Sequence, residues 1–143
     1  MYTYKYPRPS LTADILVVDT EWEHVLLIKR GHDPYKGCWA FPGGFFDMND
    51  DTIMATAQRE LEEETGISGI AMQELFTASR KGRDPRGRTV SVVFLAEVNR
   101  ASVNPHSGDD ADEAKWFSIE ELPNLAFDHA EIMEKAIKAH KER

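Results

Sequence analysis

One segment constrains the fold of this chain more than any other, because its sequence defines a helix with a start and an end. Small and apolar positions recur at helical spacing within residues 52–65, and Glu64 lies on the same stripe. These positions are Ile53, Ala57, Leu61 and Glu64. Asp50 or Asp51 is suited to the N-cap of this helix. Gly66 followed by apolar Ile67 is typical of a left-handed helix end, so the segment predicts one helix in the middle of the chain.

Apolar, β-branched runs on both sides of this helix predict two pairs of strands. The expected strands cover residues 12–19, 24–30, 71–80 and 88–98, with a short further strand at 114–117. A capping box, Asp128-His129-Ala130-Glu131, opens a final helix to about Lys141. The order β-β-loop-α-β-β-loop-α favours an α/β fold with helices covering a mixed sheet. At 143 residues the chain has room for one core, so we expect a single domain over residues 1–143.

The charge and composition of the chain exclude some classes of partner. A net charge of −8 at pH 7 argues against DNA or RNA, since phosphate backbones bind to basic surfaces. The single cysteine, Cys38, allows no internal disulfide and fits a reducing compartment. No stretch approaches a membrane span, so we expect a cytoplasmic protein without a membrane partner. A small anionic substrate remains compatible if arginines or metal ions meet its charge.

The predicted helix concentrates negative charge on one face. Glu60, Glu63 and Glu64 share that face at 100° per residue, whereas Glu62 points elsewhere. Carboxylates at this spacing repel one another. Mg²⁺ or Mn²⁺ prefers such oxygen ligands and would supply the missing positive charge; a solvated acidic surface is the alternative. The glycines at 43–44 let the backbone come close, so a peptide carbonyl can join the ligands.

These residues resemble the Nudix box, whose pattern is Gly, five residues, Glu, seven residues, then Arg-Glu-apolar-any-Glu-Glu-any-Gly-apolar. The segment from Arg59 to Ile67, RELEEETGI, matches the second half at every fixed position. The first half differs twice: Asp51 stands where the family has glutamate, and six residues separate it from Gly44. The segments KGCWAFPGG before the box and AKWFSIEELP after it are also similar to Nudix proteins, so the resemblance covers most of the chain.

The resemblance implies a Nudix-type α/β/α sandwich with a mixed sheet and a catalytic loop-helix-loop. It also implies a hydrolase of nucleoside diphosphates linked to another moiety. By position, Glu63 and Glu64 would be metal ligands, Glu60 a ligand or the base that orients water, and the Gly43 carbonyl a further ligand. Arg59 would hold the glutamates in place. Such hydrolysis needs in-line water and neutralised phosphate oxygens, which two or more Mg²⁺ (or Mn²⁺) ions can provide.

The substrate side is expected in the segment KGRDPRGR. Three arginines, Arg83, Arg86 and Arg88, stand on one predicted turn. In a chain of net charge −8 this cluster favours contacts with phosphate or ribose, and a polar hairpin tip is the alternative. Arg30, at the end of a strand, is a candidate phosphate contact, with a salt bridge as the alternative. Phe46 is a candidate for stacking on adenine.

This turn, together with YPRPSLTAD, GDDADEAKWF and LAFDH, is similar to the ADP-ribose pyrophosphatase branch of the family. The resemblance implies a small nucleoside diphosphate substrate, with ADP-ribose split into AMP and ribose 5-phosphate. Some relatives carry an additional catalytic or DNA-binding domain, for which we expect no room in a chain ending at Arg143. Members of the branch are often dimers, and a homodimer formed by exchange of the N-terminal segment is an open alternative.

Nudix enzymes usually need one more acid from outside the helix. The acidic loop at 107–113 offers Glu113 and Asp110, and the sequence does not choose between them. His32 is interpreted as surface, whereas His129 is either part of a local cap or functional. Two alternatives to an ADP-ribose hydrolase stay open: a house-cleaning nucleoside triphosphate pyrophosphohydrolase for oxidised dGTP, and a non-catalytic Nudix domain that senses ADP-ribose. The intact glutamate set argues against the sensor.

Overall fold

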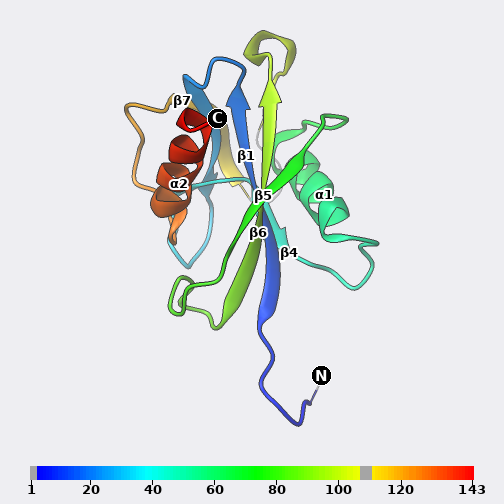
Figure 1. The fold of residues 1–143 in the computed structure, drawn as a ribbon. Coiled ribbons are helices and arrows are strands. Elements are labelled where there is room, and N and C mark those ends of the chain that lie inside the picture. Colours follow the sequence, from blue (N-terminus) through cyan, green and yellow to red (C-terminus); the bar gives the residue numbers. More distant parts are fainter. Residues whose placement is uncertain (1–2, 107–110) are drawn as a thin grey trace.

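In the part of the chain that the structure describes, seven strands form one mixed sheet with helices on its two sides (Figure 1). The computed structural model describes residues 3–106 and 111–143, without the side chains of 111 and 112. The strands are β1 (Ser10–Asp19), β2 (His24–Arg30), β3 (Trp39–Ala40), β4 (Gly43–Phe45), β5 (Gln73–Ala78), β6 (Thr89–Val98) and β7 (Ala111–Ser118). The helices are α1 (Ile53–Thr65), the short 3-10 helix η1 (Arg100–Ser102) and α2 (His129–Lys141).

β1 is the central strand of the sheet. It pairs in parallel with β6 along its whole length, and β5 continues the sheet antiparallel to β6. On its other edge β1 has two partners. It pairs with β2 near their hairpin, where Val18 lies opposite Val25, and with β4 further along, where Asp14 lies opposite Gly43. An apolar, β-branched strand suits this position, because both of its faces are covered.

β1 and β2 separate beyond their hairpin, and a short segment fills the gap between them. β3 pairs with β2 and β4 pairs with β1, while β7 covers the other edge of β2. The separation brings Asp14 of β1, Arg30 of β2 and Gly43 of β4 to the same opening in the fold. The topology, rather than any one element, therefore creates the space for a site.

The core has two layers, one on each face of the sheet. Ile15 of β1 packs in the cluster that contains Leu61 of α1. Its neighbour Leu16 packs in the other cluster, with Met133 of α2. This alternation follows from the period of two in a strand. The predicted α/β/α sandwich with a mixed sheet is confirmed.

The start of α1 differs from the prediction. Thr52 is the N-cap, and its Oγ1 accepts the N–H of Ala55 at 3.0 Å, so the expectation of Asp50 or Asp51 as the cap is wrong. The predicted end is confirmed, since Gly66 has φ of 77°. The carboxylates at the helix start are consequently available for other partners.

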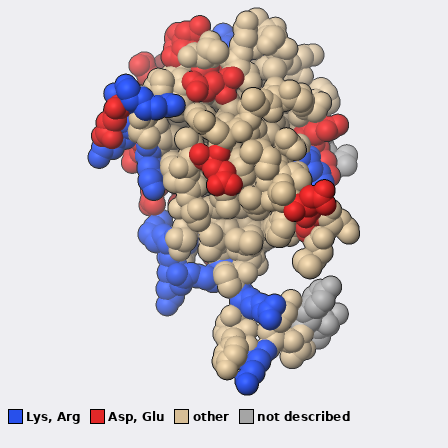
Figure 2. All heavy atoms as spheres, turned by 45° about the vertical axis from the view of Figure 1, so that its right-hand side comes forward, with Lys and Arg blue, Asp and Glu red and all other residues tan. Residues whose placement is uncertain are grey.

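The N-terminal residues before β1 extend away from the sandwich (Figure 1). On the face shown in Figure 2, basic side chains gather on this segment and along the lower edge, whereas acidic side chains are dispersed over the body. Within the described part of the chain, no helix is long and apolar enough to cross a bilayer.

Candidate active site

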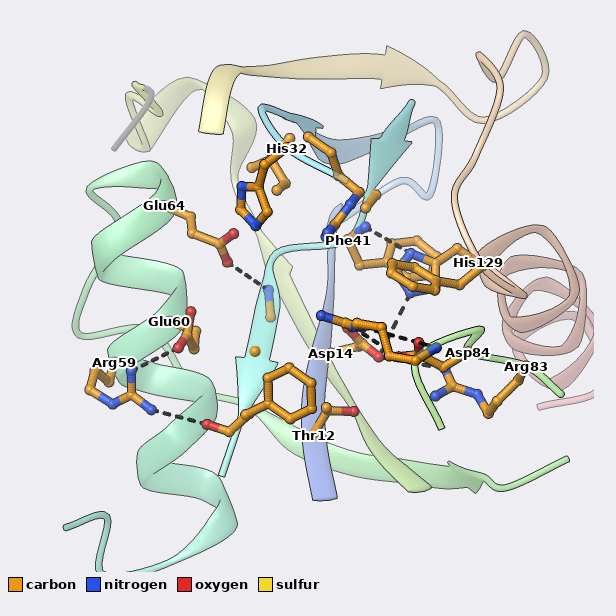
Figure 3. Close-up of a pocket in the computed structure, with 18 of the residues that line it drawn as sticks. Thr12, Asp14, His32, Phe41, Arg59, Glu60, Glu64, Arg83, Asp84 and His129 are labelled. Atoms are coloured by element: carbon orange, nitrogen blue, oxygen red, sulfur yellow. Dashed lines mark hydrogen bonds and ion pairs between the residues drawn. The ribbon is translucent and has the colours of Figure 1, made fainter. Parts of the chain in front are cut away.

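A cavity of about 320 Å³ opens where β1 and β2 separate, and two unlike walls face each other across it (Figure 3). One wall belongs to α1 and the glycine segment, and the other to the β5–β6 turn and the start of α2. The helix wall consists of Gly43, Gly44, Arg59, Glu60 and Glu64. The turn wall consists of Arg83, Asp84, Arg86, Phe127 and His129.

The helix wall brings two carboxylates to the cavity. Glu64 is buried, and its Oε1 accepts the N–H of Gly43 at 2.8 Å. A Cβ on Gly44 would lie 2.4 Å from the carboxylate carbon of Glu60, so any side chain there would displace that group. Glu62 and Glu63 are exposed. The predicted face is thus divided, with Glu60 and Glu64 inside and Glu63 at the rim.

Arg59 joins the residues at the edge of the helix wall. Its Nε and Nη2 donate to the two carboxylate oxygens of Asp50 at 3.0 and 2.9 Å. Nη1 donates to Glu60 at 2.7 Å, and Nη2 donates to the Phe45 carbonyl at 3.3 Å. The hydrogen bond from Arg59 holds the pKa of Asp50 well below its usual range, and the bond to Asp50 raises the pKa of Arg59. Arg59 is therefore charged and fixed, and it orients Glu60.

The acid that pairs with Arg59 is Asp50 rather than Asp51. Asp51 is exposed, whereas Asp50 also accepts the hydroxyl of Thr56 at 2.8 Å and so lies against the first turns of α1. Five residues, 45–49, separate Asp50 from Gly44, which is the spacing of the box. The additional residue therefore follows the acid, where the chain enters the helix, instead of preceding it.

The helix wall has the donor chemistry of a divalent-cation site. Glu60 and Glu64 line one cavity with carboxylate oxygens, and the glycine segment brings peptide groups beside them. In the observed conformation, no three acidic, histidine or cysteine side chains within residues 3–106 and 113–143 stand close enough together to hold an ion. Glu63 is directed to Arg59, with 3.5 Å between Oε2 and Nη1. The donors fit Mg²⁺ or Mn²⁺, and Glu63 would have to turn inward to join them.

The turn wall is built on a buried ion pair. Arg83 Nε and Nη2 donate to the two oxygens of Asp128 at 2.9 and 2.8 Å, and both side chains are at most 5% exposed. Asp128 precedes α2 but makes no side-chain capping bond, so the predicted capping box is wrong. The carboxylate is engaged by Arg83 instead. This bidentate pair ties the β5–β6 turn to the start of α2.

Arg86 lies at the mouth of the turn wall. It donates from Nε and Nη2 to the two oxygens of Asp84 at 3.1 and 2.9 Å. Its guanidinium group also lies 4.8 Å from the ring centroid of Phe45 and 5.4 Å from that of Phe127. Because Asp84 already engages both of these nitrogens, the charge of Arg86 is largely met within the protein.

Arg30 reaches the same region from β2. Its Nε donates to the carbonyl of Pro34 at 2.7 Å, and its guanidinium lies 5.0 Å from the centroid of Phe127. Its Nη2 is buried and has no hydrogen-bond partner among the described residues. Burial and the nearby charge of Arg86 lower the pKa of Arg30. A buried donor without a partner is unusual in proteins and is often satisfied by a ligand or water.

Asp14 and His129 meet at the floor of the cavity (Figure 3). Oδ2 of Asp14 accepts the hydroxyl of Ser91 at 2.5 Å and lies 3.8 Å from Nε2 of His129. Nδ1 of His129 accepts the N–H of Phe41 at 3.2 Å, so the neutral ring carries its proton on Nε2. Burial lowers the pKa of His129, which favours this neutral form.

The structure brings most of the predicted site residues to one cavity. Those that line it are Arg30, Gly43, Arg59, Glu60, Glu64, Arg83 and Arg86. Arg88 is exposed and does not line it, and Phe45 does so in place of Phe46. Phe45 ends β4, where consecutive side chains point to opposite faces. Asp110 lies outside the described residues.

Glu113 is placed away from the cavity. It is exposed on β7 opposite Lys29, and it does not line the cavity. Phe117, four positions on, packs in the cluster of α2, whereas Trp116 packs in that of α1. Strand alternation therefore directs Glu113 to the face opposite the helix wall.

Several lining residues were not predicted. Examples are Thr12, Asp14, Phe45, Asp47, Asp84 and Phe127. His32, interpreted as surface, lines the cavity as well, although it is exposed. One signal could have identified Asp14: it is the single charged residue in the run from Ser10 to Val18. A charge in a buried strand requires a partner or a function.

Comparison with known proteins agrees with this geometry. The family model for the NUDIX domain matches residues 8–138. The ADP-ribose pyrophosphatase of Methanocaldococcus jannaschii is 40% identical over 129 residues, which cover 90% of this chain and 73% of that protein. The ADPR responsive transcriptional repressor NtrR of Acinetobacter baylyi is 35% identical over 136 residues. That match covers 92% of this chain and 54% of the repressor, so the chain spans about half of that relative.

Solved structures are similar over nearly the whole chain. The NUDIX domain of Shewanella oneidensis NrtR, complexed with ADP ribose, has a TM-score of 0.86 at 28% identity and covers 96% of this chain and 93% of that chain. A bifunctional NMN adenylyltransferase/ADP ribose pyrophosphatase of Francisella tularensis, complexed with AMP and a Mn ion, has a TM-score of 0.80 at 28% identity. It covers 95% of this chain and 43% of that chain. With the family model matched over residues 8–138 and a relative 40% identical over most of both proteins, this chain belongs to the Nudix family.

Proposed function

We propose that the chain is a Mg²⁺-dependent hydrolase that splits the diphosphate of ADP-ribose into AMP and ribose 5-phosphate. The pairing of the two sides of the cavity carries this proposal. Glu60 and Glu64 face a space whose other side holds Arg30 and Arg86. Arg30 has one nitrogen without a partner among the described residues, and Arg86 is paired with Asp84 but exposed at the mouth. Cations held by the first side and arginines on the second would meet a diphosphate from both directions. The 40% identity to an ADP-ribose pyrophosphatase supports this choice of substrate.

On this proposal the helix wall holds the metal. Glu60, Glu63, Glu64 and the carbonyl of Gly43 would be the ligands of two or more ions, with Mn²⁺ able to replace Mg²⁺. When bound, such ions acidify a water molecule and neutralise charge on the phosphate oxygens. Arg59 keeps Glu60 oriented, since it is itself fixed by two hydrogen bonds to Asp50. The water to be activated would be placed in line with phosphorus on this side of the cavity.

Arg30 is the candidate for direct contact with a phosphate oxygen. Its Nη2 is buried without a partner among the described residues, and burial together with the nearby charge of Arg86 lowers the pKa of Arg30. A phosphate oxygen would accept a hydrogen bond from this nitrogen. Its negative charge would also reduce the repulsion between the guanidinium groups of Arg30 and Arg86. Arg83 is less suited to this role, because Asp128 engages it in a buried bidentate pair.

A substrate panel tests the proposal. The chain is incubated with Mg²⁺, and separately with Mn²⁺, together with ADP-ribose, other nucleotide sugars and nucleoside triphosphates that include oxidised dGTP. Ion-exchange chromatography of the products is expected to show AMP and ribose 5-phosphate in equal amounts. A monophosphate with pyrophosphate would instead select the house-cleaning activity. If neither metal supports cleavage of any of these compounds, the chain is not a hydrolase of this kind.

A non-catalytic ADP-ribose sensor is the second candidate. The match to a repressor described as ADPR responsive, and the likeness to a NUDIX domain that holds ADP ribose, favour it. The group formed by Arg59, Glu60 and Glu64 favours turnover, because binding alone requires no activated water. Calorimetric titration with ADP-ribose and Mg²⁺, followed by product analysis of the same sample, separates the two. Saturable binding without product would select the sensor.

A further inference from the structure

Asp14 is a charged residue within a buried apolar strand, and the proposed hydrolysis gives it no role. It is the single charge between Ser10 and Val18, and it is 8% exposed. Removing a carboxylate from water is costly unless partners compensate it. Its remaining exposed surface faces the cavity, which it lines beside Gly43 and His129 (Figure 3). A residue with these properties is a candidate for ligand recognition.

The two oxygens of Asp14 differ in their surroundings. Oδ2 accepts the hydroxyl of Ser91 at 2.5 Å and lies 3.8 and 3.9 Å from His129 Nε2 and Arg83 Nη2. No described residue donates a hydrogen bond to Oδ1. A Cβ on Gly43 would lie 2.6 Å from Oδ1, so this oxygen is directed to the glycine of the helix wall. Oδ2 is held by the protein, and Oδ1 has capacity for a ligand.

The charges around Asp14 decide which ligand suits it. Arg83 is already engaged in two hydrogen bonds with Asp128, so it does not neutralise Asp14 fully. His129 is neutral, since burial lowers its pKa and Phe41 donates to its Nδ1. Two acids and two arginines surround His129, so the charges nearly balance, but at Asp14 itself a carboxylate oxygen that accepts no hydrogen bond from the described residues is presented to the ligand. A phosphate group would be repelled there, whereas a neutral group with hydrogen-bond donors would be attracted.

The pattern of donors and acceptors points to hydroxyl groups. Oδ1 of Asp14 accepts, and the Nε2–H of His129 donates. A hydroxyl does both, so a pair of neighbouring hydroxyls satisfies the two protein groups at once. The edge of adenine also offers a donor beside an acceptor, its N6 amine next to N1 or N7, so the test must separate the sugar from the base. We propose that Asp14, with His129, binds the vicinal hydroxyl groups of a ribose. This deepens the proposed function and rests on it, because ADP-ribose contains two such sugars.

The position of Gly43 supports the assignment. Its N–H donates to Glu64 on the metal side, while the space beside its Cα is occupied by Oδ1 of Asp14. One residue thus separates the two carboxylates. A ribose on Asp14 would place its attached phosphate toward the helix wall, where the scissile bond of the proposed reaction belongs. Either sugar of ADP-ribose has this relation to the diphosphate, so the test must distinguish them.

Binding to the unmodified protein provides the first test. Calorimetry with Mg²⁺ compares ribose 5-phosphate with 2-deoxyribose 5-phosphate, and AMP with 2′-deoxy-AMP. A hydrogen bond to a charged group corresponds to about 10- to 100-fold in affinity, so one pair should differ by that factor and thereby identify the sugar. Differences below about twofold in both pairs overturn the proposal. The measurement needs no turnover, so its failure is distinct from a failure to hydrolyse ADP-ribose.

Variants provide the second test. Asp14→Asn should reduce the preference for the hydroxylated ligand to less than about threefold, while the deoxy ligand binds as before. Ser91→Ala is the matched control, since it removes the bond to Oδ2 and keeps the carboxylate; its ligand preference should persist. If Asp14→Asn does not fold, the ligand pairs on the unmodified protein and on Ser91→Ala decide. The proposal is overturned if Asp14→Asn keeps the full preference for the hydroxylated ligand. It is also overturned if the variant loses a preference for AMP over IMP instead.

Discussion

The two walls of the cavity are built in opposite ways. The helix wall comes from one continuous stretch, residues 43–64, in which a single helix places Arg59, Glu60 and Glu64. The turn wall joins segments that are distant in the sequence: Arg83 and Asp128 are 45 positions apart. The first wall is acidic, and the local spacing of the sequence orients its side chains. The second wall contains arginines whose charges are largely met by aspartates, and the tertiary fold orients them. Chemistry is therefore expected to depend on the first, and stability on the second.

The largest effect is expected at Glu64. Glu64→Gln keeps an oxygen that can accept the N–H of Gly43 but removes the charge that a cation needs. A metal ion contributes several kcal/mol to transition-state stabilisation, so we expect turnover of ADP-ribose to fall about a thousandfold while the urea midpoint barely changes. Glu62→Gln, an exposed residue on the same helix, is the matched control and should remain fully active. A Glu64→Gln protein with more than a tenth of the activity would remove Glu64 from the metal site.

The next effect tests the turn wall through its buried ion pair. Asp128→Ala leaves the guanidinium of Arg83 buried without its partner, which costs about 3–5 kcal/mol of unfolding free energy. The structure offers a matched control between the same two segments, because Arg80 donates to both oxygens of Glu131 at 3.0 and 3.1 Å on the surface. Glu131→Ala should cost less than about 1 kcal/mol, since that pair is exposed and screened. Urea denaturation measures both, and equal losses would contradict the contrast.

The sequence predicted the helix wall well because its information is local. The spacing of the glutamates, the glycine segment and the helix end are all contained in one stretch. One detail predicted wrongly, the acid that pairs with Arg59, also has a local cause. Thr52 is the N-cap of α1, so Asp50 is available to pair with Arg59. The residue by which this segment exceeds the Nudix box therefore follows Asp50. Neither detail follows from the count of residues, because both depend on where the first turn of α1 begins.

The turn wall could be predicted only as a cluster of arginines. Its geometry depends on α2 and the separated strands, so the sequence could not show that Arg83 is engaged by Asp128 or that Arg88 lies outside. The capping pattern at Asp128 was misleading, since the tertiary partner prevailed over the local one. Phe127 was missed for the same reason, because it joins the site only once α2 has packed on the sheet, whereas Asp14 could have been identified as a lone charge in an apolar run.

A smaller effect distinguishes the two neighbouring aspartates of the helix wall. Asp50→Asn removes a charged acceptor that fixes Arg59, and through it Glu60, so activity should fall about 10- to 100-fold, as for other residues that orient metal ligands. Asp51→Asn should have no effect, because Asp51 is exposed. Steady-state kinetics at saturating and limiting Mg²⁺ measures both changes, and the loss in Asp50→Asn should be larger at limiting Mg²⁺. A larger loss of activity in Asp51→Asn than in Asp50→Asn would assign to Asp51 the pairing with Arg59 that its position in the sequence suggested.

The smallest effect concerns the response of the turn wall to pH. Burial places the pKa of His129 below its ordinary value of 6.5. The unfolded chain therefore binds this proton before the folded chain does. The contribution of His129 to stability is fully present above about pH 6.5. It is lost as the pH falls toward the folded pKa, with a slope of at most about 1.4 kcal/mol per pH unit. Asp14 and Asp128 oppose this shift, whereas Arg83 and Arg30 reinforce it.

Urea denaturation between pH 8 and 5.5 isolates this contribution. Asp50 stays charged throughout this range, because Arg59 holds its pKa well below its usual value. The protein should lose stability more steeply below pH 6.5 than His129→Gln, whose remaining histidines are unchanged. Parallel curves would mean that the acids at the floor offset burial, so that His129 takes up its proton at the same pH in the folded and the unfolded chain. In that case the turn wall would gain a positive charge below about pH 6.5, and the difference in charge between the two walls would be larger than the contacts indicate.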